Sequence, residues 1–259
     1  MEISTVGLRV LVTGAASGIG RKTAEAFAAS GAEVMICDVS QEHLAGFAAD
    51  NPSIGTIEAD VSDPAAVARM FDATVARLGG LDVLVNNAGI TGPTGGVETL
   101  SVEDWERTLA VDITGMFCCT RLAVPFLKQA GGGSIINLSS AAGRLPYAWR
   151  TPYAAAKWAV VGFTLSLALE LGPSNIRCNA LQPGHVTGER HDRNSRNRAA
   201  LLGVSFEELE DAARSRVAMR RFIEPEEVAA MAVFLASDLG RSISGQAIGI
   251  CGYLQHFGQ

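Results

Sequence analysis

Tyr153 and Lys157 have the residue types and the spacing for proton-transfer chemistry. Thr151 is a good N-cap and Pro152 suits the first helical position, so a helix is predicted to begin here, with the pair one turn apart on one face. A tyrosine hydroxyl has a reference pKa of about 10, so acting as a base near neutral pH requires a drop of roughly three units, or about 4 kcal/mol. A lysine cation about 5 Å away supplies ~3 kcal/mol at an effective dielectric near 20, and a second nearby cation would supply the rest. Alone, the spacing also fits an exposed surface pair.

A glycine-rich turn lies between the first predicted strand, residues 8–13, and the first predicted helix, residues 21–29. Glycines at such a turn let a pyrophosphate approach the backbone N–H groups at the helix N-terminus. Glycine turns without a ligand are also common, so this motif depends on its neighbours for support. The predicted cofactor contacts in the turn are Gly14, Ser17, Gly18, Ile19 and Gly20.

Asp38 ends the second predicted strand, residues 33–38. A carboxylate at this place can accept hydrogen bonds from an adenosine ribose, and it would repel a 2′-phosphate. The glycine turn carries Ser17 and has no arginine or lysine before Gly18 that could bind such a phosphate. These residues favour NAD over NADP. The oxidised nicotinamide ring of NAD is also the second cation that the tyrosine requires.

The composition excludes several classes of protein. At 259 residues, 48% of them hydrophobic, the chain can bury a large core, and its net charge of -6 argues against nucleic acid as a partner. Apolar runs are broken by charges or glycines, so no membrane span is predicted, and the N-terminus lacks a signal-peptide pattern. Five scattered cysteines and four unpaired histidines predict free thiols and no metal site. A cytoplasmic protein is expected.

Strands alternate with helices along the chain, and the strands are continuous apolar runs. This pattern predicts an α/β fold, a Rossmann-type doubly wound parallel sheet of about seven strands with helices on both faces, in a single domain spanning residues 1–259. The predicted strands are residues 8–13, 33–38, 53–59, 81–86, 133–139, 175–181 and 247–250. The predicted helices are residues 21–29, 41–49, 64–78, 101–128 with a bend at Pro125, a helix from Thr151 that ends before Gly172, and 225–236. A polar segment at about 185–221 is predicted to be a substrate lid.

Taken together, these motifs resemble the short-chain dehydrogenase/reductase family, and the resemblance covers essentially the whole chain. Each motif alone is weak, but seven in the family's order and spacing are strong. The matching segments are Thr13–Gly20, Asp60-Val61, Asn86-Asn-Ala-Gly89, Ser139-Ser140, Tyr153–Lys157, Pro183-Gly184 and Ser244-Gly-Gln246.

The resemblance implies a role for each matching residue. Tyr153 would be the catalytic acid/base, Lys157 would activate it and hold the nicotinamide ribose, and Ser140 would hydrogen-bond the substrate oxygen. The family spacing selects Ser140 rather than Ser139. Further cofactor contacts are expected at Asp60, Val61, Asn87, Ala88, Gly89, Pro183, Gly184 and the backbone of Val186.

The sequence departs from the family pattern at three positions. Asp112 stands where the family usually has Asn, so it would keep a water near Lys157 and add a negative charge. Gly188 replaces a threonine, whose contact would be lost or supplied by Thr187, and Cys251 replaces an aspartate, with a structural role expected. We expect activity to be retained, with Asp112 as an uncertain member of the catalytic set.

Substrate contacts are expected from three loops: residues 90–96, 141–150 and 185–198. Arg150 and His185 are the predicted substrate residues. The last loop is rich in arginine, which suits a carboxylate, sulfonate or phosphate, although a solvated amphipathic lid explains the same composition. Tyr147 and Trp149 fit either an apolar wall or a subunit contact.

The sequence therefore predicts an NAD-dependent dehydrogenase that acts with a small-molecule secondary alcohol or ketone, such as a sugar, a polyol or a small cyclic or aromatic alcohol. A ketoreductase of acyl or polyketide type is the enzymatic alternative. A catalytically impaired NAD-binding regulator is the alternative from another class. The resemblance implies a homotetramer or homodimer built on the helices that begin near Ser101 and Thr151.

Overall fold

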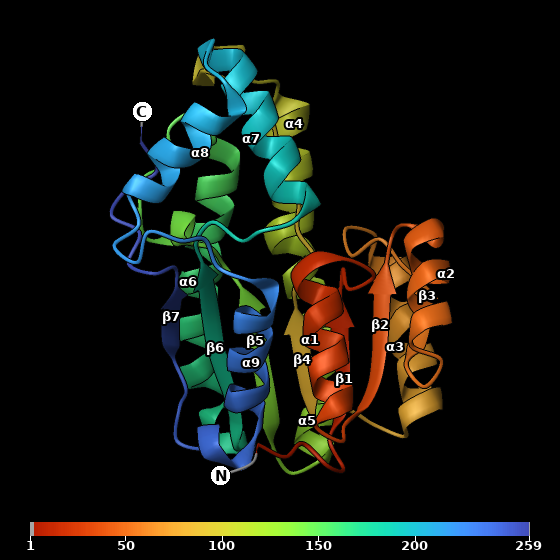
Figure 1. The fold of residues 1–259 in the computed structure, drawn as a ribbon. Coiled ribbons are helices and arrows are strands. Elements are labelled where there is room, and N and C mark those ends of the chain that lie inside the picture. Colours follow the sequence, from red (N-terminus) through yellow and green to blue (C-terminus); the bar gives the residue numbers. More distant parts are fainter. Residues whose placement is uncertain (1–2, 259) are drawn as a thin grey trace.

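A parallel sheet of seven strands forms the middle layer of the chain, in the order β3-β2-β1-β4-β5-β6-β7 (Figure 1). The computed structural model describes residues 3–258. The strands are β1 (Arg9–Thr13), β2 (Glu33–Asp38), β3 (Gly55–Glu58), β4 (Val83–Asn86), β5 (Gly133–Leu138), β6 (Ile176–Pro183) and β7 (Gln246–Ile250). All neighbouring strands are parallel, so their carboxyl ends meet at one edge. The predicted doubly wound Rossmann-type sheet is confirmed.

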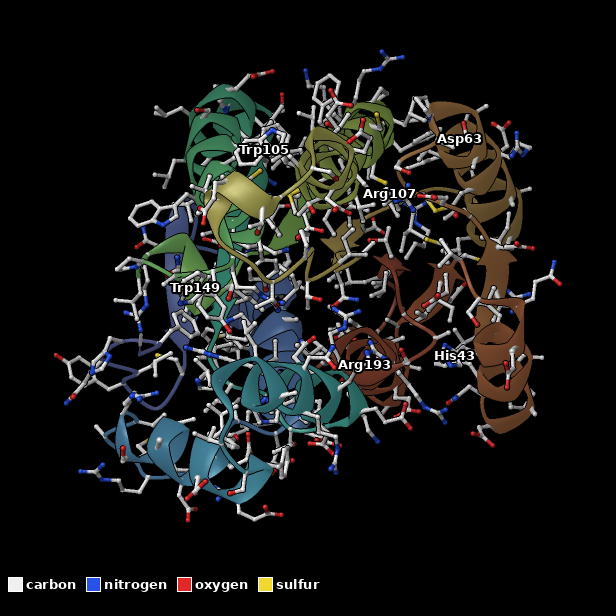
Figure 2. The ribbon with its side chains drawn as sticks, turned by 90° about the horizontal axis from the view of Figure 1, so that it is seen from above. His43, Asp63, Trp105, Arg107, Trp149 and Arg193 are labelled. Carbon is white, nitrogen blue, oxygen red and sulfur yellow. The ribbon has the colours of Figure 1, made fainter. Side chains whose placement is uncertain are left out.

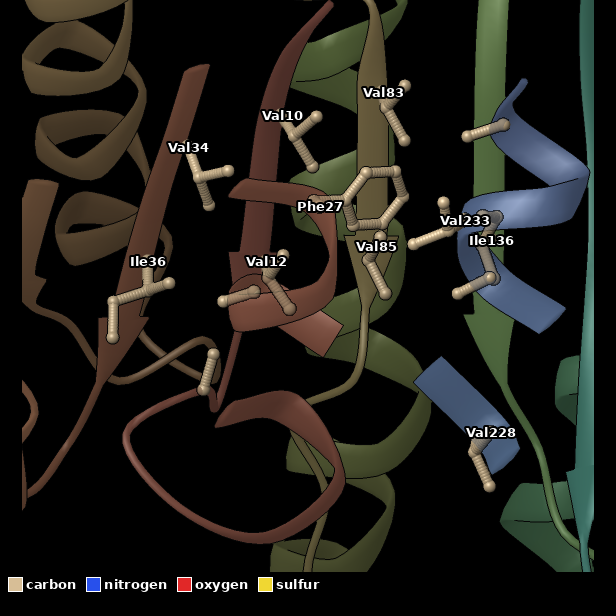
Figure 3. Close-up of a cluster of buried hydrophobic side chains, with 14 of the residues drawn as sticks. Val10, Val12, Phe27, Val34, Ile36, Val83, Val85, Ile136, Val228 and Val233 are labelled. Carbon is tan, nitrogen blue, oxygen red and sulfur yellow. The ribbon is translucent and has the colours of Figure 1, made fainter. Parts of the chain in front are cut away.

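Helices cover both faces of the sheet because its strands are apolar on both sides. One face carries α1 (Gly18–Ala29), α2 (Gln41–Asp50) and α9 (Pro225–Ala236), and the other carries α3 (Pro64–Leu78), α4 (Val102–Leu109), α5 (Gly115–Gln129) and α6 (Thr151–Leu171). Along β1, Val10 and Val12 belong to the first core and Leu11 to the second. Figure 3 shows Phe27 of α1 and Val233 of α9 in the core of Val10 and Val12.

Polar residues at the helix ends fix where two of these helices begin. The side chain of Asp63 accepts a hydrogen bond from the Ala65 N–H at 2.9 Å and caps α3, which Gly79 ends in the left-handed conformation. The Ser101 hydroxyl accepts from the Asp104 N–H at 3.0 Å and caps α4. These caps fix the first residues of α3 and α4.

The prediction that Thr151 caps α6 is wrong by one residue. Thr151 is the first helical residue, and the N-cap is Arg150, whose side chain makes no cap hydrogen bond. The first turn closes when the backbone C=O of Arg150 accepts from the Ala154 N–H at 2.9 Å. The guanidinium of Arg150 is instead turned to Thr94.

The helix predicted over residues 101–128 contains a turn of π-helix. Helix α4 ends at Leu109, the π turn covers Ala110–Thr114, and α5 continues from Gly115 with Pro125 inside it. The π turn holds Asp112, whose side chain is fully buried. Single π turns inside helices are frequent at functional sites. The hydrophobic pattern does not reveal this one, because apolar residues continue through it from α4 to α5.

Two segments are long and apolar enough to cross a membrane, judged by length and composition alone. They are Val102–Gln129 and Thr151–Ser174, each with a mean hydropathy of 1.4 over its best window. Both pack on one face of the sheet, where Leu127 and Leu167 contribute to its core. The fold therefore accounts for these segments as layer helices of the α/β sandwich.

The polar segment at 185–221 forms two helices above the carboxyl ends of the strands. They are α7 (Glu189–Leu202) and α8 (Phe206–Ser215), and Figure 1 places both over the sheet edge, away from the helical layers. Helix α8 begins with a capping box between Ser205 and Glu208. The segment is tied back by bridges from Val186 to Ile223 and from Val217 to Leu254.

Candidate active site

A cavity of about 960 Å³ opens at the carboxyl ends of the strands, which is where open α/β sheets bind ligands. Its wall contains Gly14, Ser17, Gly18, Ile19, Gly20, Asp38, Asp60, Val61, Asn87, Ala88, Gly89, Ser140, Arg150, Tyr153, Lys157, Pro183, Gly184, His185 and Val186. Every predicted site residue is therefore in the wall except Asp112, which lies behind Lys157. Figure 2 looks onto this edge and shows Arg193 of α7 lying between His43 and Trp149.

The glycine turn is held by close backbone contacts. Gly14 has a φ of 60°, and a Cβ built on it would lie 2.7 Å from the Cα of Ala88. A Cβ on Gly20 would lie 2.5 Å from the Gly14 carbonyl oxygen. The Asn87 side chain donates to the carbonyl oxygens of Thr13 and Gly14 at 2.9 and 2.7 Å, which locks the turn to the end of β4. The turn thus has a fixed shape.

The open side of this turn fits a phosphate group. A Cβ on Gly18 would meet nothing within 4 Å, so the backbone is exposed to the cavity at the point where α1 begins. No acidic side chain lies in the first turn of α1 and no side chain caps it. The N–H groups at a helix start carry a partial positive charge that attracts anions. These residues therefore fit the pyrophosphate of a dinucleotide.

Asp38 is positioned by two backbone groups. Its Oδ2 accepts from the Ala16 N–H at 3.1 Å and its Oδ1 from the Ser40 N–H at 3.2 Å. The carboxylate retains lone pairs for a ribose, since each oxygen accepts one of these bonds.

The cations nearest the turn already have acidic partners. Arg21 pairs with Asp50 and Glu25, whose hydrogen bonds raise the pKa of the guanidinium. Lys22 likewise pairs with Glu25 and Glu226, and its pKa is raised by hydrogen bonds to them. Arg21 and Lys22 thus line the cavity, but both are already paired with carboxylates.

Asp60 is held by Arg107, which is not among the site residues predicted from the sequence. Its Oδ1 accepts from the Ser62 backbone and hydroxyl, and its Oδ2 accepts from Arg107 of α4 at 3.1 Å. Burial raises the pKa of Asp60, but the hydrogen bonds from Ser62 and Arg107 outweigh this effect and hold it below its ordinary value. Figure 2 shows Arg107 at this end of the cavity. The carboxylate is therefore ionised where an adenine ring is expected.

The catalytic candidates come from three elements that meet under the lid. Lys157 Nζ lies 5.5 Å from the ring centroid of Tyr153 and donates to the Leu138 carbonyl oxygen at 3.1 Å. The Ser139 hydroxyl donates to the Lys157 carbonyl oxygen at 2.8 Å, so it braces α6. The Ser140 hydroxyl accepts from the Ala142 N–H at 3.1 Å and keeps its own proton for a ligand.

Asp112 forms a buried ion pair with Lys157. Its Oδ2 lies 3.2 Å from Lys157 Nζ, and its Oδ1 accepts from the Ile90 N–H at 2.7 Å. A Cβ on Gly89 would lie 3.2 Å from Lys157 Nζ and 3.4 Å from Asp112 Oδ1, so Gly89 packs closely against the pair. Asp112 thus links the loop after β4 to Lys157.

The other two departures have local explanations. The hydroxyl of Thr187 hydrogen-bonds the carboxylate of Glu224, so it is already engaged. Cys251 is buried, and a Cβ on Gly184 would lie 2.8 Å from its Cβ. Cys251 also accepts a hydrogen bond at its Sγ from Arg144 at 2.7 Å. Cys251 therefore has a packing role at the end of the last strand.

The lid side of the cavity is a cluster of rings and charges. The His185 ring lies 5.3 Å from Phe222, 5.6 Å from Phe257 and 5.7 Å from His191, measured between centroids. Burial first, and then the positive charges of neighbouring groups, lower the pKa of His185 to about 4. His191 Nε2 contacts Glu210 at 3.0 Å. His185 is therefore a neutral group at neutral pH.

A family model described as enoyl-(acyl carrier protein) reductase matches residues 14–252. The chain belongs to the short-chain dehydrogenase/reductase family. It is an oxidoreductase of alcohol and ketone chemistry, and its family uses a nicotinamide cofactor, NAD or NADP.

Named members of this family are similar over nearly the whole chain. A trans-4-hydroxycyclohexanecarboxylate dehydrogenase of Sinomonas cyclohexanicum is 38% identical over 93% of this chain and 90% of its own. A 3-oxoacyl-[acyl-carrier-protein] reductase of Thermotoga maritima is 37% identical over 94% of this chain and 96% of its own. The crystal structure of a levodione reductase matches with a TM-score of 0.90 and 30% identity, over 95% of this chain and 97% of the other.

Two residues that support this site are not among those predicted from the sequence. The Thr13 hydroxyl accepts from the N–H groups of Asn87 and Ala88, both at 3.1 Å. Asn137 accepts from Asn86 at 2.9 Å and so ties β5 to β4. Thr13 opens a quoted motif, so its signal was present, whereas Asn137 lies in an apolar run. In residues 3–258, no group of three or more His, Cys, Asp or Glu side chains is arranged to hold a metal ion.

Proposed function

We propose that this chain is an NAD-dependent dehydrogenase of a secondary alcohol, interconverting it with the ketone. The observation that carries the proposal is the placement of Ser140, Tyr153 and Asp38 in the wall of one cavity. A proton acceptor and a ribose-binding carboxylate thereby share a single site with the anion-binding start of α1. Sugars, polyols and small cyclic or aromatic alcohols are the proposed substrates.

The choice of NAD rests on charge. Asp38 is oriented by the Ala16 and Ser40 N–H groups towards the place of an adenosine ribose, where a 2′-phosphate would meet its negative charge. Arg21 and Lys22 are paired with carboxylates, so neither offers an unneutralised cation to such a phosphate. Repulsion without a compensating cation disfavours NADP.

The proposed proton transfer uses the chain's own groups. The Tyr153 hydroxyl, deprotonated, takes the proton of the substrate hydroxyl, and the Ser140 hydroxyl binds the same oxygen as the carbonyl forms. The nicotinamide ring, when bound, supplies the hydride acceptor. Lys157 keeps a positive charge 5.5 Å from the tyrosine ring and favours the phenolate. In the reverse direction, Tyr153 donates the proton.

Lys157 is immobilised before any ligand arrives. The Leu138 carbonyl oxygen accepts a hydrogen bond from its ammonium group, and the Asp112 carboxylate forms an ion pair with it. The ammonium group is proposed to reach the nicotinamide ribose with a remaining N–H. Positioning of this kind contributes a large share of the rate when proton transfer is otherwise modest. The ion pair also reduces the net charge that the tyrosine senses.

The relatives support a small cyclic or hydroxylated substrate. One similar protein is named for a hydroxycyclohexanecarboxylate and one solved structure for levodione. Both names fit a compact secondary alcohol or ketone, and neither fixes the substrate of this chain.

We also propose a homotetramer or homodimer in the cytoplasm. Large apolar side chains are exposed on the helices of one face, with Leu169 at 85% exposed, and they fit a partner copy. The exposed set on α4, α5 and α6 is Val102, Trp105, Phe117, Trp158, Leu165 and Leu169. Both apolar segments that are long enough for a membrane belong to this face.

Two other functions each have one observation in their favour. A relative named as a 3-oxoacyl-[acyl-carrier-protein] reductase supports a ketoreductase of acyl or polyketide type. The Asp112–Lys157 ion pair supports an NAD-binding regulator without turnover, because the carboxylate offsets the lysine charge that would favour the phenolate of Tyr153. The position of Asp38 weighs against the first, and the cavity placement of Ser140 and Tyr153 against the second.

The deciding experiment is NADH formation from a panel of secondary alcohols, polyols, sugars and hydroxy acids at alkaline pH, with NAD and NADP compared side by side. Turnover with NAD that is lost in Tyr153→Phe is the expected result. Preference for NADP, with reduction of acyl thioesters, would favour the ketoreductase. NAD binding without turnover of any compound would favour the regulator, and turnover gained in Asp112→Asn would assign the cause to the carboxylate.

A further inference from the structure

Arg150 is a buried arginine in the wall of the cavity that holds Tyr153. Its side chain is 8% exposed, and it is the N-cap of α6, three positions before Tyr153 in the sequence. Guanidinium groups remain charged at all ordinary pH values, so this position places a permanent positive charge inside the substrate end of the cavity.

The guanidinium of Arg150 lacks the partners that a buried cation normally has. Its Nη1 donates to the Thr94 hydroxyl at 2.6 Å, and its carbon lies 5.8 Å from the ring centroid of Tyr147. Its Nε is buried without a hydrogen-bond acceptor, and no carboxylate of residues 3–258 lies within 4.0 Å of it. A buried charge without an anion or a full set of acceptors is costly.

Arg177 shows how this chain satisfies an arginine that has only a structural role. Its Nη1 donates to the carbonyl oxygens of Leu235 and Gly240, and its Nη2 donates to that of Ala236. Those carbonyls belong to the end of α9 and the turn after it, so Arg177 fastens the chain. Arg150 has no equivalent set of carbonyls and faces a cavity instead.

The backbone before Arg150 is held in a strained conformation. Trp149 has a φ of 65°, which is an outlier for a large side chain, and its carbonyl oxygen accepts from the Gly95 N–H at 3.0 Å. The indole remains 46% exposed while the next residue is buried. Backbone strain of this kind collects at ligand sites.

We infer that Arg150 binds a carboxylate of the substrate, which makes the substrate a hydroxy acid and the product the matching keto acid. This inference rests on the proposed function and names its substrate class. A planar carboxylate matches the planar guanidinium and supplies the anionic partner that Arg150 lacks among residues 3–258. The positive end of the α6 dipole lies at the same place and adds to the attraction.

The carboxylate contact predicts a strong preference for hydroxy acids over their esters. This preference can be measured with the unmodified protein. A charge-assisted hydrogen bond is worth about 1.5–3 kcal/mol, so the kcat/KM for a hydroxy acid is expected to exceed that for its methyl ester by about 10–100-fold or more. The probes are 4-hydroxycyclohexanecarboxylate, its methyl ester and cyclohexanol, extended by a series of 2-, 3- and 4-hydroxy acids. Equal kcat/KM for acid and ester would overturn the inference.

Variants assign the preference to one side chain. Arg150→Gln is expected to remove most of the acid preference, mainly by raising the KM of the acid. Arg150→Lys keeps the charge and is expected to recover part of the preference. Arg193→Gln is the matched control, because Arg193 is an exposed arginine in the same cavity wall. Loss of acid preference in the control but not in Arg150→Gln would overturn the assignment.

A binding measurement separates this inference from the proposed function. Cyclohexanecarboxylate has no hydroxyl to oxidise, so its binding to the enzyme–NADH complex, measured by calorimetry, requires no turnover. Binding to the unmodified protein that is lost in Arg150→Gln supports the inference even if no alcohol is oxidised. Absence of binding to the unmodified protein, or tighter binding of cyclohexyl phosphate than of the carboxylate, overturns it. Turnover of cyclohexanol alone would then leave the proposed function standing.

Discussion

The cofactor side and the lid side of the cavity are built in different ways. The cofactor side is a set of backbone contacts, in which Gly14 and Gly20 leave no room for a Cβ and Asn87 bonds the turn directly. The lid side is a set of side-chain contacts. It includes Arg196 over the Phe206 ring at 4.6 Å and Arg214 over that of Phe222 at 4.9 Å.

The two sides also differ in how deeply they are anchored. Helix α1 buries Gly20, Thr23, Ala24 and Phe27, whereas α7 buries only Ala199 among its described residues. Few buried apolar contacts mean a low free energy of local opening. A rigid cofactor side and a loosely anchored lid suit an enzyme whose cofactor is fixed and whose substrate differs from one relative to the next.

Tyr153→Phe is expected to have the largest effect, because Tyr153 lies where the two sides meet. Its ring packs against the cluster of Val217 and Phe257, while its hydroxyl is the proposed proton acceptor. General acid–base catalysis contributes about 10²–10⁴-fold, so kcat is expected to fall by about 10³-fold or more. NADH fluorescence titration should give an unchanged Kd. Ser139→Ala is the control, and a kcat loss equal to that of Tyr153→Phe there would point to distortion of α6.

Gly14→Ala and Gly203→Ala compare the two sides directly. Both glycines have positive φ values, 60° and 67°, but only a Cβ at Gly14 would meet backbone, 2.7 Å from Ala88 Cα. Gly203→Ala is expected to cost about 1 kcal/mol of unfolding free energy, as a left-handed conformation alone does. Gly14→Ala should cost about 3 kcal/mol or more, since the turn must also move. Urea unfolding measures both, and equal losses would contradict the contrast.

Much of the cofactor side could be predicted from the sequence because its function fixes residue types at short spacing. A turn that cannot accept a Cβ requires glycine, and a carboxylate after β2 requires an acid, so Gly14, Gly20 and Asp38 are visible in the sequence itself. The parallel, doubly wound character of the sheet followed from the alternation of apolar strands with helices.

The remaining features depend on contacts between distant segments. No local pattern connects Arg107 with Asp60, which it binds. The π turn that buries Asp112 and the missing acceptor of Arg150 Nε are likewise visible only in the folded chain. The prediction that Thr151 caps α6 was wrong because the register of that turn is set by Arg150. Lid composition alone did not separate a solvated helix from an anion site.

Asp38→Asn tests how far charge alone sets the cofactor preference. The amide keeps the size of the side chain and can still bind a ribose, but it loses the negative charge that repels a 2′-phosphate. Charged hydrogen bonds are worth about 1.5–3 kcal/mol, so the ratio of kcat/KM for NAD over NADP is expected to fall by about 10–100-fold. Asp63→Asn, on the exposed cap of α3, is the control. An unchanged ratio in Asp38→Asn would mean that the shape of the site, rather than its charge, sets the preference for NAD.

The smallest expected effect is the pH dependence of stability caused by His185, and it reports on the lid. The pKa of His185 is lowered to about 4 from 6.5 by burial and then by His191, Arg198 and Arg216, and Glu210 faces the same group through its contact with His191. Between these two values the unfolded chain binds a proton that the folded chain does not. Stability therefore falls as the pH falls from 6.5 towards 4, and this contribution is complete above 6.5.

His185 is only half-buried, so solvent screening reduces the effect of its pKa shift on stability. Between pH 7 and pH 5, the unmodified protein is expected to lose about 1–2 kcal/mol more unfolding free energy than His185→Gln. Urea unfolding at the two pH values measures the difference, and His43→Gln, on the exposed surface of α2, should behave like the unmodified protein. Limited proteolysis locates the change: if the lid is the weaker side, cleavage within residues 185–221 increases at pH 5 before the sheet unfolds. Loss of stability without lid cleavage would mean that the two sides open together, which would contradict the contrast between a rigid cofactor side and a separately opening lid.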